Sequence, residues 1–332
     1  MIRREGVRVK VPASTANLGP GFDTLGMALS LYSWIEMKPA ESTVFHLYGE
    51  EMKGLPDDKS NLVYQVAQSV FAEAGVSVPE LEISMVSDIP LTRGLGSSAS
   101  AIVGALFAAN LLIGEPLSQA KLFDMATALE RHPDNVGASL FGGIITAVWD
   151  GSHADVLRIE PPADLEVLVA IPDFQLSTSK AREALPRQVS LQDAVYNVSR
   201  TSLLSAALSA GRLDLIPAAM RDRLHQPYRA SLVPGMARIL EEAPQHGALG
   251  AALSGAGPTL LALADRRHAS GKKLEAFLLE VLGEHGISAQ TMWLKPCTFG
   301  VMELTMDKED SFLDYTQSVS SKSRVFDRKM TF

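Results

Sequence analysis

Residues 90–99 read P-L-T-R-G-L-G-S-S-A, and this stretch decides the fold because it joins a predicted strand to a predicted helix. Before it, apolar Leu81, Ile83 and Met85 alternate with polar residues, as in a half-buried strand. From Ala99 onward the run A-S-A-I-V-G-A-L-F-A-A-N-L-L-I-G is apolar on nearly every side, which predicts a buried helix. We therefore expect a strand, a glycine-rich turn and a buried helix in this order.

The residue types of this loop suit a bound phosphate. Gly94 and Gly96 allow a tight turn and a close approach of backbone to ligand, where a Cβ would clash. The N–H groups of the first helical turn favour an anion, and the hydroxyls of Ser97 and Ser98 can cap the helix and reach a phosphate-bound Mg²⁺. A loop that only caps a core helix would have the same composition, so the loop alone leaves nucleotide binding open. It is not a Walker loop, because no G-K-[ST] follows.

Composition narrows the class of protein. The 332 residues suffice for two domains, and 46% hydrophobic with 20% charged residues is typical of a globular chain. The net charge of −8 gives no electrostatic reason to expect a nucleic-acid partner. The single cysteine, Cys297, excludes an internal disulfide and fits the cytoplasm. Residues 94–114 lack charge, but their apolar part is about 15 residues, shorter than the ~20 of a membrane span. We expect neither a signal peptide nor a membrane partner.

Strands and helices come in groups, which predicts an α+β fold. The alternation at 7–11 predicts a strand that ends at Pro12 and leads into the loop S-T-A-N-L-G-P-G-F-D. Ser60 is the expected cap of the first helix. The expected helices lie at residues 61–74, 117–129, 193–210 and 234–242, and further strands at 144–148, 165–171 and on both sides of a turn within 248–264.

A second motif, E-R-H-P-D-N-V-G-A-S-L-F-G-G, spans residues 130–143. The carboxylate of Glu130 is a hard ligand suited to Mg²⁺, although a Glu at a helix end is usually solvated. Asn135 carries a donor and an acceptor and could orient a hydroxyl. His132 could be a general base or a structural residue, and the residues alone do not decide between them.

A third motif, G-A-L-G-A-A-L-S-G-A-G-P-T, spans residues 247–259. Its turn at 254–258 has no bulky side chain, so its backbone could pack against another loop or a ligand. A tight turn between buried strands explains it equally well.

In order and spacing these motifs resemble the GHMP kinases (galactokinase, homoserine kinase, mevalonate kinase and phosphomevalonate kinase) over about residues 7–300. The phosphate loop of that family, P-x-x-x-G-L-G-S-S-A, is matched in full by residues 90–99. The resemblance implies an N-terminal ATP-binding domain at 1–155, with a fold like domain 2 of ribosomal protein S5. It also implies a ferredoxin-like C-terminal domain at 156–305 that contributes to the substrate site. Residues 306–332 form a tail without an assigned role.

Within the family the chain resembles the homoserine kinase branch. The segments V-P-A-S-T-A-N-L-G-P-G-F-D-T-L-G, S-T-S-K-A-R-E-A-L-P and H-Q-P-Y-R carry this likeness. It implies that the substrate is L-homoserine, a zwitterion of threonine biosynthesis. The carboxylate would meet Arg182 and Arg229, whose planar donors suit it, and the ammonium would meet Asp23. The substrate residues implied are Asn17, Asp23, Asn135, Thr178, Arg182, Arg229 and Gly257.

The resemblance also implies ATP as the phosphoryl donor. The expected nucleotide-binding residues are Pro90, Arg93, Gly94, Leu95, Gly96, Ser97, Ser98, Ala99 and Ser100. Ser98 and Glu130 would hold Mg²⁺, and the catalytic group would be Asn135, Glu130, Ser98 and Asp134. A general base stays open, with Asp134 the weaker candidate because residues 12–26 lack the lysine of the mevalonate kinase branch.

Two departures and two alternatives remain. Arg131 stands where the family often has a glycine, and could lie near the phosphates or in solvent. Gly137 replaces the usual alanine. The acceptor could be another small alcohol such as mevalonate, although mevalonate has no ammonium for Asp23, or the chain could be a non-catalytic binding protein. The resemblance further implies a cytoplasmic homodimer.

Overall fold

A long antiparallel hairpin organises the first sheet. The computed structural model describes all of the chain except residues 1, 3, 269–270, 307–310, 315 and 317–332. Within it, β1 pairs with β2, β2 pairs with β4 and β5, and β3 lies parallel to β4. The short β11 flanks β1, and β6 pairs with β5. The strands of this sheet are β1 (Val7–Ala16), β2 (Leu25–Pro39), β3 (Val44–Tyr48), β4 (Leu81–Ser87), β5 (Ile144–Trp149), β6 (Ala154–Ile159) and β11 (Met302–Leu304).

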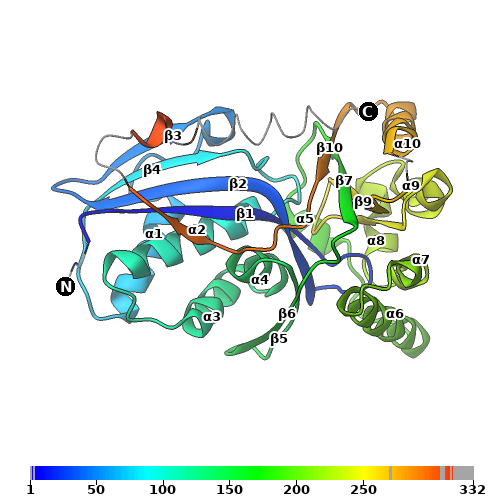
Figure 1. Cartoon of the computed structure of the whole chain (residues 1–332), viewed down its shortest axis with the longest axis horizontal. Coiled ribbons are helices and arrows are strands. Elements are labelled where there is room, and N and C mark those ends of the chain that lie inside the picture. Colours follow the sequence, from blue (N-terminus) through cyan, green and yellow to red (C-terminus); the bar gives the residue numbers. More distant parts are fainter. Residues whose placement is uncertain (1, 3, 269–270, 307–310, 315, 317–332) are drawn as a thin grey trace.

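Helices cover one face of this sheet (Figure 1). They are α1 (Leu62–Glu73), α2 (Ser97–Leu112), α3 (Gln119–Glu130) and α4 (Asp134–Phe141), with the short η1 (Glu50–Met52) beside β4. Val7, Val9 and Val11 point from β1 into the core between sheet and helices. Most residues of α2 are buried, which confirms the buried helix expected after the glycine-rich loop.

The second sheet is a four-stranded antiparallel sheet in the order β10-β7-β9-β8. Its strands are β7 (Leu165–Pro172), β8 (Gly250–Leu253), β9 (Leu260–Asp265) and β10 (Ala289–Leu294). One apolar cluster joins it to α9 and α10, and another joins it to α6, α7 and the near ends of β1 and β2. The remaining elements are α5 (Thr178–Glu183), α6 (Leu191–Ser209), η2 (Leu213–Leu215), α7 (Ile216–Ala219), α8 (Gln226–Arg229), η3 (Ala230–Leu232), α9 (Met236–Glu242), η4 (Ala243–His246) and α10 (Gly271–Glu284).

The α+β prediction is confirmed, and two local predictions are wrong. Strand β1 does not end at Pro12 but continues to Ala16, because a register shift between Pro12 and Ala13 accommodates the proline without breaking the pairing with β2. The cap of α1 is Asn61 rather than Ser60, since the Asn61 side chain accepts from the Val63 N–H at 2.9 Å.

The division at residues 155 and 156, which the resemblance implies, stays a proposal. It falls within β6, a strand of the first sheet, to which β11 also returns. Of the expected tail, residues 307–310, 315 and 317–332 lie outside the described part.

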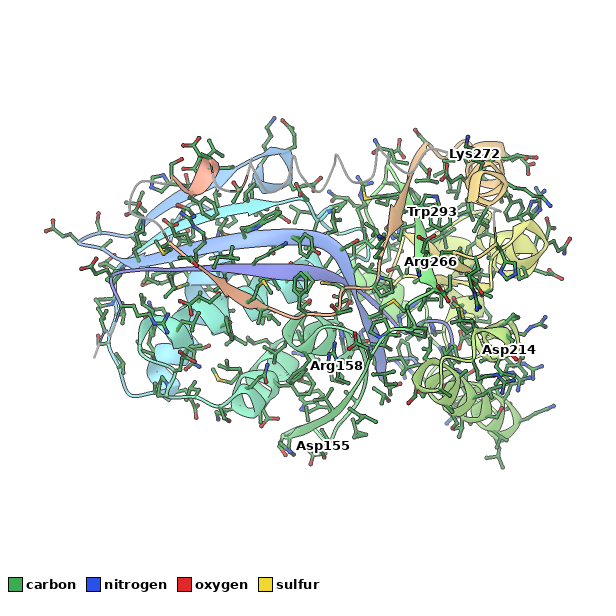
Figure 2. All side chains as sticks on the ribbon, in the orientation of Figure 1. Asp155, Arg158, Asp214, Arg266, Lys272 and Trp293 are labelled. Atoms are coloured by element: carbon green, nitrogen blue, oxygen red, sulfur yellow. The ribbon has the colours of Figure 1, made fainter. Side chains whose placement is uncertain are left out.

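Charged side chains such as Asp155, Asp214 and Lys272 lie at the periphery (Figure 2). Among the described residues, no helix has the length and apolar character needed to cross a membrane.

Candidate active site

The glycine-rich loop opens on a cavity of about 130 Å³ to which both halves of the chain contribute. Fourteen of the residues predicted for the site line it, and they come from the loop, from the ends of α3 and β1, and from α4, α5, α8 and the β8–β9 turn. They are Asn17, Asp23, Gly94, Gly96, Ser97, Ser98, Ala99, Glu130, Asp134, Asn135, Thr178, Arg182, Arg229 and Gly257.

Two glycines let neighbouring backbone reach the loop. Gly94 and Gly96 have φ of +80° and +73°, which side-chain-bearing residues rarely adopt. A Cβ on Gly96 would lie 2.1 Å from Ser14 Oγ, and one on Gly94 would lie 2.3 Å from the carbonyl oxygen of Ser254. The loop is therefore fixed between β1 and the β8–β9 turn, which brings the third motif against the phosphate loop.

The amino end of α2 faces the cavity without a side-chain cap. Its N-cap residue is Gly96, which offers no side-chain hydrogen bond, and the predicted cap by Ser97 or Ser98 is wrong. The Ser98 hydroxyl instead donates to the carboxylate of Glu130 at the end of α3. The first-turn N–H groups thus remain available to an anion, next to a serine–glutamate pair of hard oxygen atoms.

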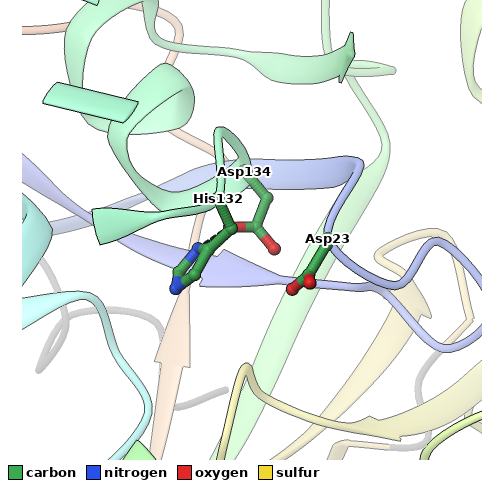
Figure 3. A group of neighbouring side chains, drawn as sticks. All are labelled: Asp23, His132 and Asp134. Carbon is green, nitrogen blue, oxygen red and sulfur yellow. Dashed lines mark hydrogen bonds and ion pairs between the residues drawn. The ribbon is translucent and has the colours of Figure 1, made fainter. Parts of the chain in front are cut away.

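A chain of alternating charge continues from Glu130. Nδ1 of His132 lies 2.6 Å from Asp134 Oδ1, and its Nε2 lies 3.6 Å from Glu130 Oε2. Burial disfavours the imidazolium, but Asp134, Glu130 and Asp23 outweigh it and raise the pKa of His132 to about 9. Asp23, His132 and Asp134 are near neighbours, as Figure 3 shows, with ligand atoms within 4.8 Å of one another.

The raised pKa favours the structural one of the two roles left open for His132. An imidazolium has no lone pair to accept a proton and it repels a cation, so the raised pKa argues against both a general-base role and metal ligation by His132. Asp134 Oδ1 lies 2.6 Å from His132 Nδ1 and accepts from the Asn135 N–H at 2.7 Å. Arg131 has φ of +67° as the residue that ends α3, which explains why glycine is common at this position, and its side chain is exposed.

The predicted ammonium site contains an ion pair. Arg182 donates to both carboxylate oxygens of Asp23, at 2.9 and 3.1 Å, and each side chain is about one-third exposed. Asn17 Oδ1 accepts from the Asp23 N–H at 3.0 Å, while its Nδ2 donates to the carbonyl of Gly255. The pair is therefore held against the β8–β9 turn but stays open to the cavity.

Arg229 is a buried cation with only 2% of its surface exposed. It donates to the carbonyls of Ala181 and Gly255 at 3.0 and 3.1 Å, and to His225 Nδ1 at 3.2 Å. Burial and the charge of Arg182 lower its pKa to about 10, so it is charged at neutral pH. Its Nη2 has no hydrogen-bond partner among the described residues, and the side chain lines the cavity.

Asn135 stands between the phosphate loop and these charged groups. Its Oδ1 accepts from Ser14 Oγ at 3.0 Å. No hydrogen bond to its Nδ2 is found in the described part of the chain. This amide therefore presents a donor to the cavity, which suits a hydroxyl oxygen.

Four of the residues predicted to bind the nucleotide do not line this cavity, namely Pro90, Arg93, Leu95 and Ser100. Leu95 is fully buried in the core, and the guanidinium of Arg93 donates to the carbonyls of Pro172 and Asp173. Ser100 donates to the Ser97 carbonyl at 2.9 Å and lines a second cavity.

This second cavity, of about 260 Å³, was missed by the sequence reasoning. Most of its lining is apolar and comes from β2, β4, α1 and the segment after η1. Thr92, Ser97 and Ser98 line both cavities, so the phosphate loop lies between them. Its other lining residues include Trp34, Met52, Leu55, Leu62, Met85 and Ala101. A strand pattern cannot signal it, since the lining residues look like ordinary core residues.

Two family models match the chain. The GHMP kinases N terminal domain matches residues 61–143, and the GHMP kinases C terminal model matches residues 204–280. The first match contains the phosphate loop and the second motif, and the second contains Arg229 and the β8–β9 turn. The chain therefore belongs to the GHMP kinases, a class of phosphotransferases.

Within this class, homoserine kinases are among the similar relatives. That of Deinococcus radiodurans is 46% identical over 284 residues, covering 86% of this chain and 92% of the relative. That of Moorella thermoacetica is 43% identical over 294 residues, covering 89% and 98%. The crystal structure of homoserine kinase from Cytophaga hutchinsonii superposes with a TM-score of 0.81 at 26% identity, covering 92% of this chain and 99% of that one. A mevalonate kinase structure, at 16% identity and a TM-score of 0.64, shows the shared fold alone.

Proposed function

We propose that this chain transfers the γ-phosphate of ATP to the side-chain hydroxyl of L-homoserine. One observation carries the proposal: two guanidiniums, a carboxylate and a free amide donor line a single cavity beside the phosphate loop. A zwitterionic amino acid offers a carboxylate to Arg182 and Arg229 and an ammonium to Asp23. Two homoserine kinases are 46% and 43% identical to the chain, which favours this acceptor over mevalonate and over a non-catalytic role.

The second cavity suits the purine of ATP. Its apolar walls would cover the faces of the base, and its volume lies next to the shared loop residues Thr92, Ser97 and Ser98. The triphosphate would follow residues 93–100 past the uncapped end of α2, with the γ-phosphate directed into the first cavity. In this arrangement Arg93 contributes by fixing the loop to the end of β7 rather than by contacting phosphate.

Ser98 and Glu130 fit a magnesium ion. The two side chains are hydrogen-bonded to each other at the amino end of α2, and both offer hard oxygen atoms. Bound there, Mg²⁺ would neutralise charge on the transferring phosphate. The imidazolium of His132 lies beside Glu130, fixes the neighbouring Asp134, and adds a second positive charge near the transferring group.

Phosphoryl transfer needs positioning and charge neutralisation more than covalent help from the protein. We propose that Asn135 Nδ2 donates to the attacking hydroxyl oxygen while Arg182, Arg229 and Asp23 fix the far end of the substrate. Thr178, at the start of α5, and Gly257 close the cavity around it. Asp134 is a positioning carboxylate in this mechanism, since its Oδ1 contacts the His132 ring and accepts from the backbone N–H of Asn135.

A coupled ADP-release assay tests the proposal. With Mg-ATP, we expect turnover on L-homoserine and none on mevalonate, galactose or L-threonine. Turnover on mevalonate or galactose alone would support kinase activity but would reject L-homoserine as the acceptor. Binding of ATP without turnover on any of the four would reject the catalytic proposal for these acceptors.

We further propose that the protein is a homodimer, on its resemblance to homoserine kinases. We also propose a cytoplasmic location, because the single buried Cys297 fits a reducing compartment. Sedimentation equilibrium across a concentration series tests the assembly.

A further inference from the structure

One aromatic ring stands against both arginines of the cavity. The Phe22 ring centroid lies 5.6 Å from the guanidinium carbon of Arg182 and 5.3 Å from that of Arg229. Phe22 is half-buried and lines the cavity next to Asp23. The negative face of an aromatic ring attracts cations at such distances, so a single residue contacts both groups expected to hold a carboxylate.

A buried histidine also packs against this ring. His225 is fully buried, and its ring stacks on Phe22 with centroids 5.1 Å apart and an interplanar angle of 27°. Its Nε2 donates to the Gly19 carbonyl at 2.7 Å, while its Nδ1 accepts from Arg229 at 3.2 Å. Burial lowers the pKa of His225, which agrees with the neutral tautomer that these two bonds require. His225 therefore joins the 17–23 loop to Arg229.

We propose that Phe22, supported by His225, is the residue that positions Arg182 and Arg229 as a pair for the substrate carboxylate. The inference rests on the proposed function, because that function supplies the carboxylate. It assigns a role to two residues that lie within the first and third of the segments resembling homoserine kinases but are outside the predicted site.

The physical need for such a residue comes from like charge. Two guanidiniums that face one carboxylate repel each other before it arrives, and Arg182 indeed lowers the pKa of Arg229. Asp23 neutralises Arg182 in the free site, but the substrate ammonium must share that carboxylate once it binds. The ring of Phe22 keeps its attraction for both cations with or without substrate. Phe22 thus preserves the spacing of the two guanidiniums while Asp23 turns from Arg182 to the substrate ammonium.

The test uses Phe22→Leu, which keeps apolar bulk but removes the ring, and Phe22→Tyr, which restores it. We expect Phe22→Leu to raise the KM for L-homoserine about tenfold, equivalent to about 1.4 kcal/mol. The KM for ATP and kcat should stay within about twofold, because the ring contacts of Phe22 are with Arg182, Arg229 and His225, which we place at the carboxylate end of the substrate. Phe22→Tyr should return the KM toward the wild-type value. Phe45→Leu, in β3 and remote from the cavity, is the matched control for loss of a partly buried ring.

A truncated acceptor sharpens the test. 3-Aminopropan-1-ol keeps the ammonium and hydroxyl of homoserine but lacks the carboxylate, so Phe22→Leu should leave its kcat/KM unchanged. Two substitutions test His225. In His225→Asn the side-chain oxygen can accept near the position of Nδ1, whereas His225→Leu has no acceptor. We expect a lower KM for L-homoserine in His225→Asn than in His225→Leu. We expect the two variants to have the same melting temperature and the same KM for ATP.

Two results would overturn the inference. One is an unchanged homoserine KM in Phe22→Leu, and the other is an equal loss of kcat/KM on 3-aminopropan-1-ol. Absence of wild-type turnover on L-homoserine would instead reject the proposed function itself.

Discussion

The His132 imidazolium should make folding stability fall as pH rises. Its side chain is 10% exposed, and Asp134 and Glu130 bind its two nitrogens. Burial opposes the charge, yet the surrounding carboxylates raise the pKa from 6.5 in the unfolded chain to about 9. Below pH 6.5 both states hold the proton, and between pH 6.5 and 9 only the folded state holds it. The stabilisation is therefore complete below pH 6.5 and is lost as pH rises through 9.

The size of this effect follows from the shift. At about 1.4 kcal/mol for each pKa unit, the rise corresponds to about 3 kcal/mol, an order-of-magnitude value for a coupled group. Urea unfolding followed by tryptophan fluorescence, without nucleotide or Mg²⁺, would measure it from pH 6 to pH 10. The matched variant is His132→Asn, which can still donate to Asp134 but does not titrate. The stability difference between wild type and variant should shrink by that amount across the range, and a difference independent of pH would refute the reasoning.

Three further predictions concern the reaction. Arg229→Lys keeps the charge but loses the planar fork, so the KM for L-homoserine should rise about 10- to 100-fold in the ADP-release assay, with the KM for ATP unchanged. Glu130→Gln should lower kcat at saturating substrates about a hundredfold and raise the Mg²⁺ concentration for half-maximal rate, which a Mg²⁺ titration measures; an unaltered titration would remove Glu130 from the metal site. Ala101→Phe should fill the second cavity and raise the KM for ATP at least about tenfold while sparing homoserine, and an unchanged KM for ATP would place the purine elsewhere.

Local sequence patterns predicted the main elements because their causes are local. Alternation and helical spacing depend on residues within a few positions of one another, and α2 and α3 lie close to where these patterns place them. The errors at Pro12 and Ser60 arose where alternatives compete over one or two residues. A bulge after Pro12 lets β1 continue, and Asn61 rather than Ser60 caps α1. Hydrophobic periodicity predicts neither the bulge nor the identity of the cap.

The sequence, through its motifs and the family that they resemble, determined the class of chemistry. The order of glycines, serines, arginines and carboxylates specifies which charges and hydrogen-bonding groups the chain can offer, and fourteen of the predicted site residues do line one cavity. The donors, acceptors and charges of a side chain follow from its residue type, so they can be predicted without knowledge of the fold.

Only the tertiary structure decided how these groups act on one another. Asp23 and Arg182 are 159 positions apart in the sequence yet share two hydrogen bonds, and Phe22 meets His225 and both arginines only through space. The charge on His132 depends on three carboxylates gathered around a buried ring. Distances and desolvation set these properties, and both are created when distant segments pack together.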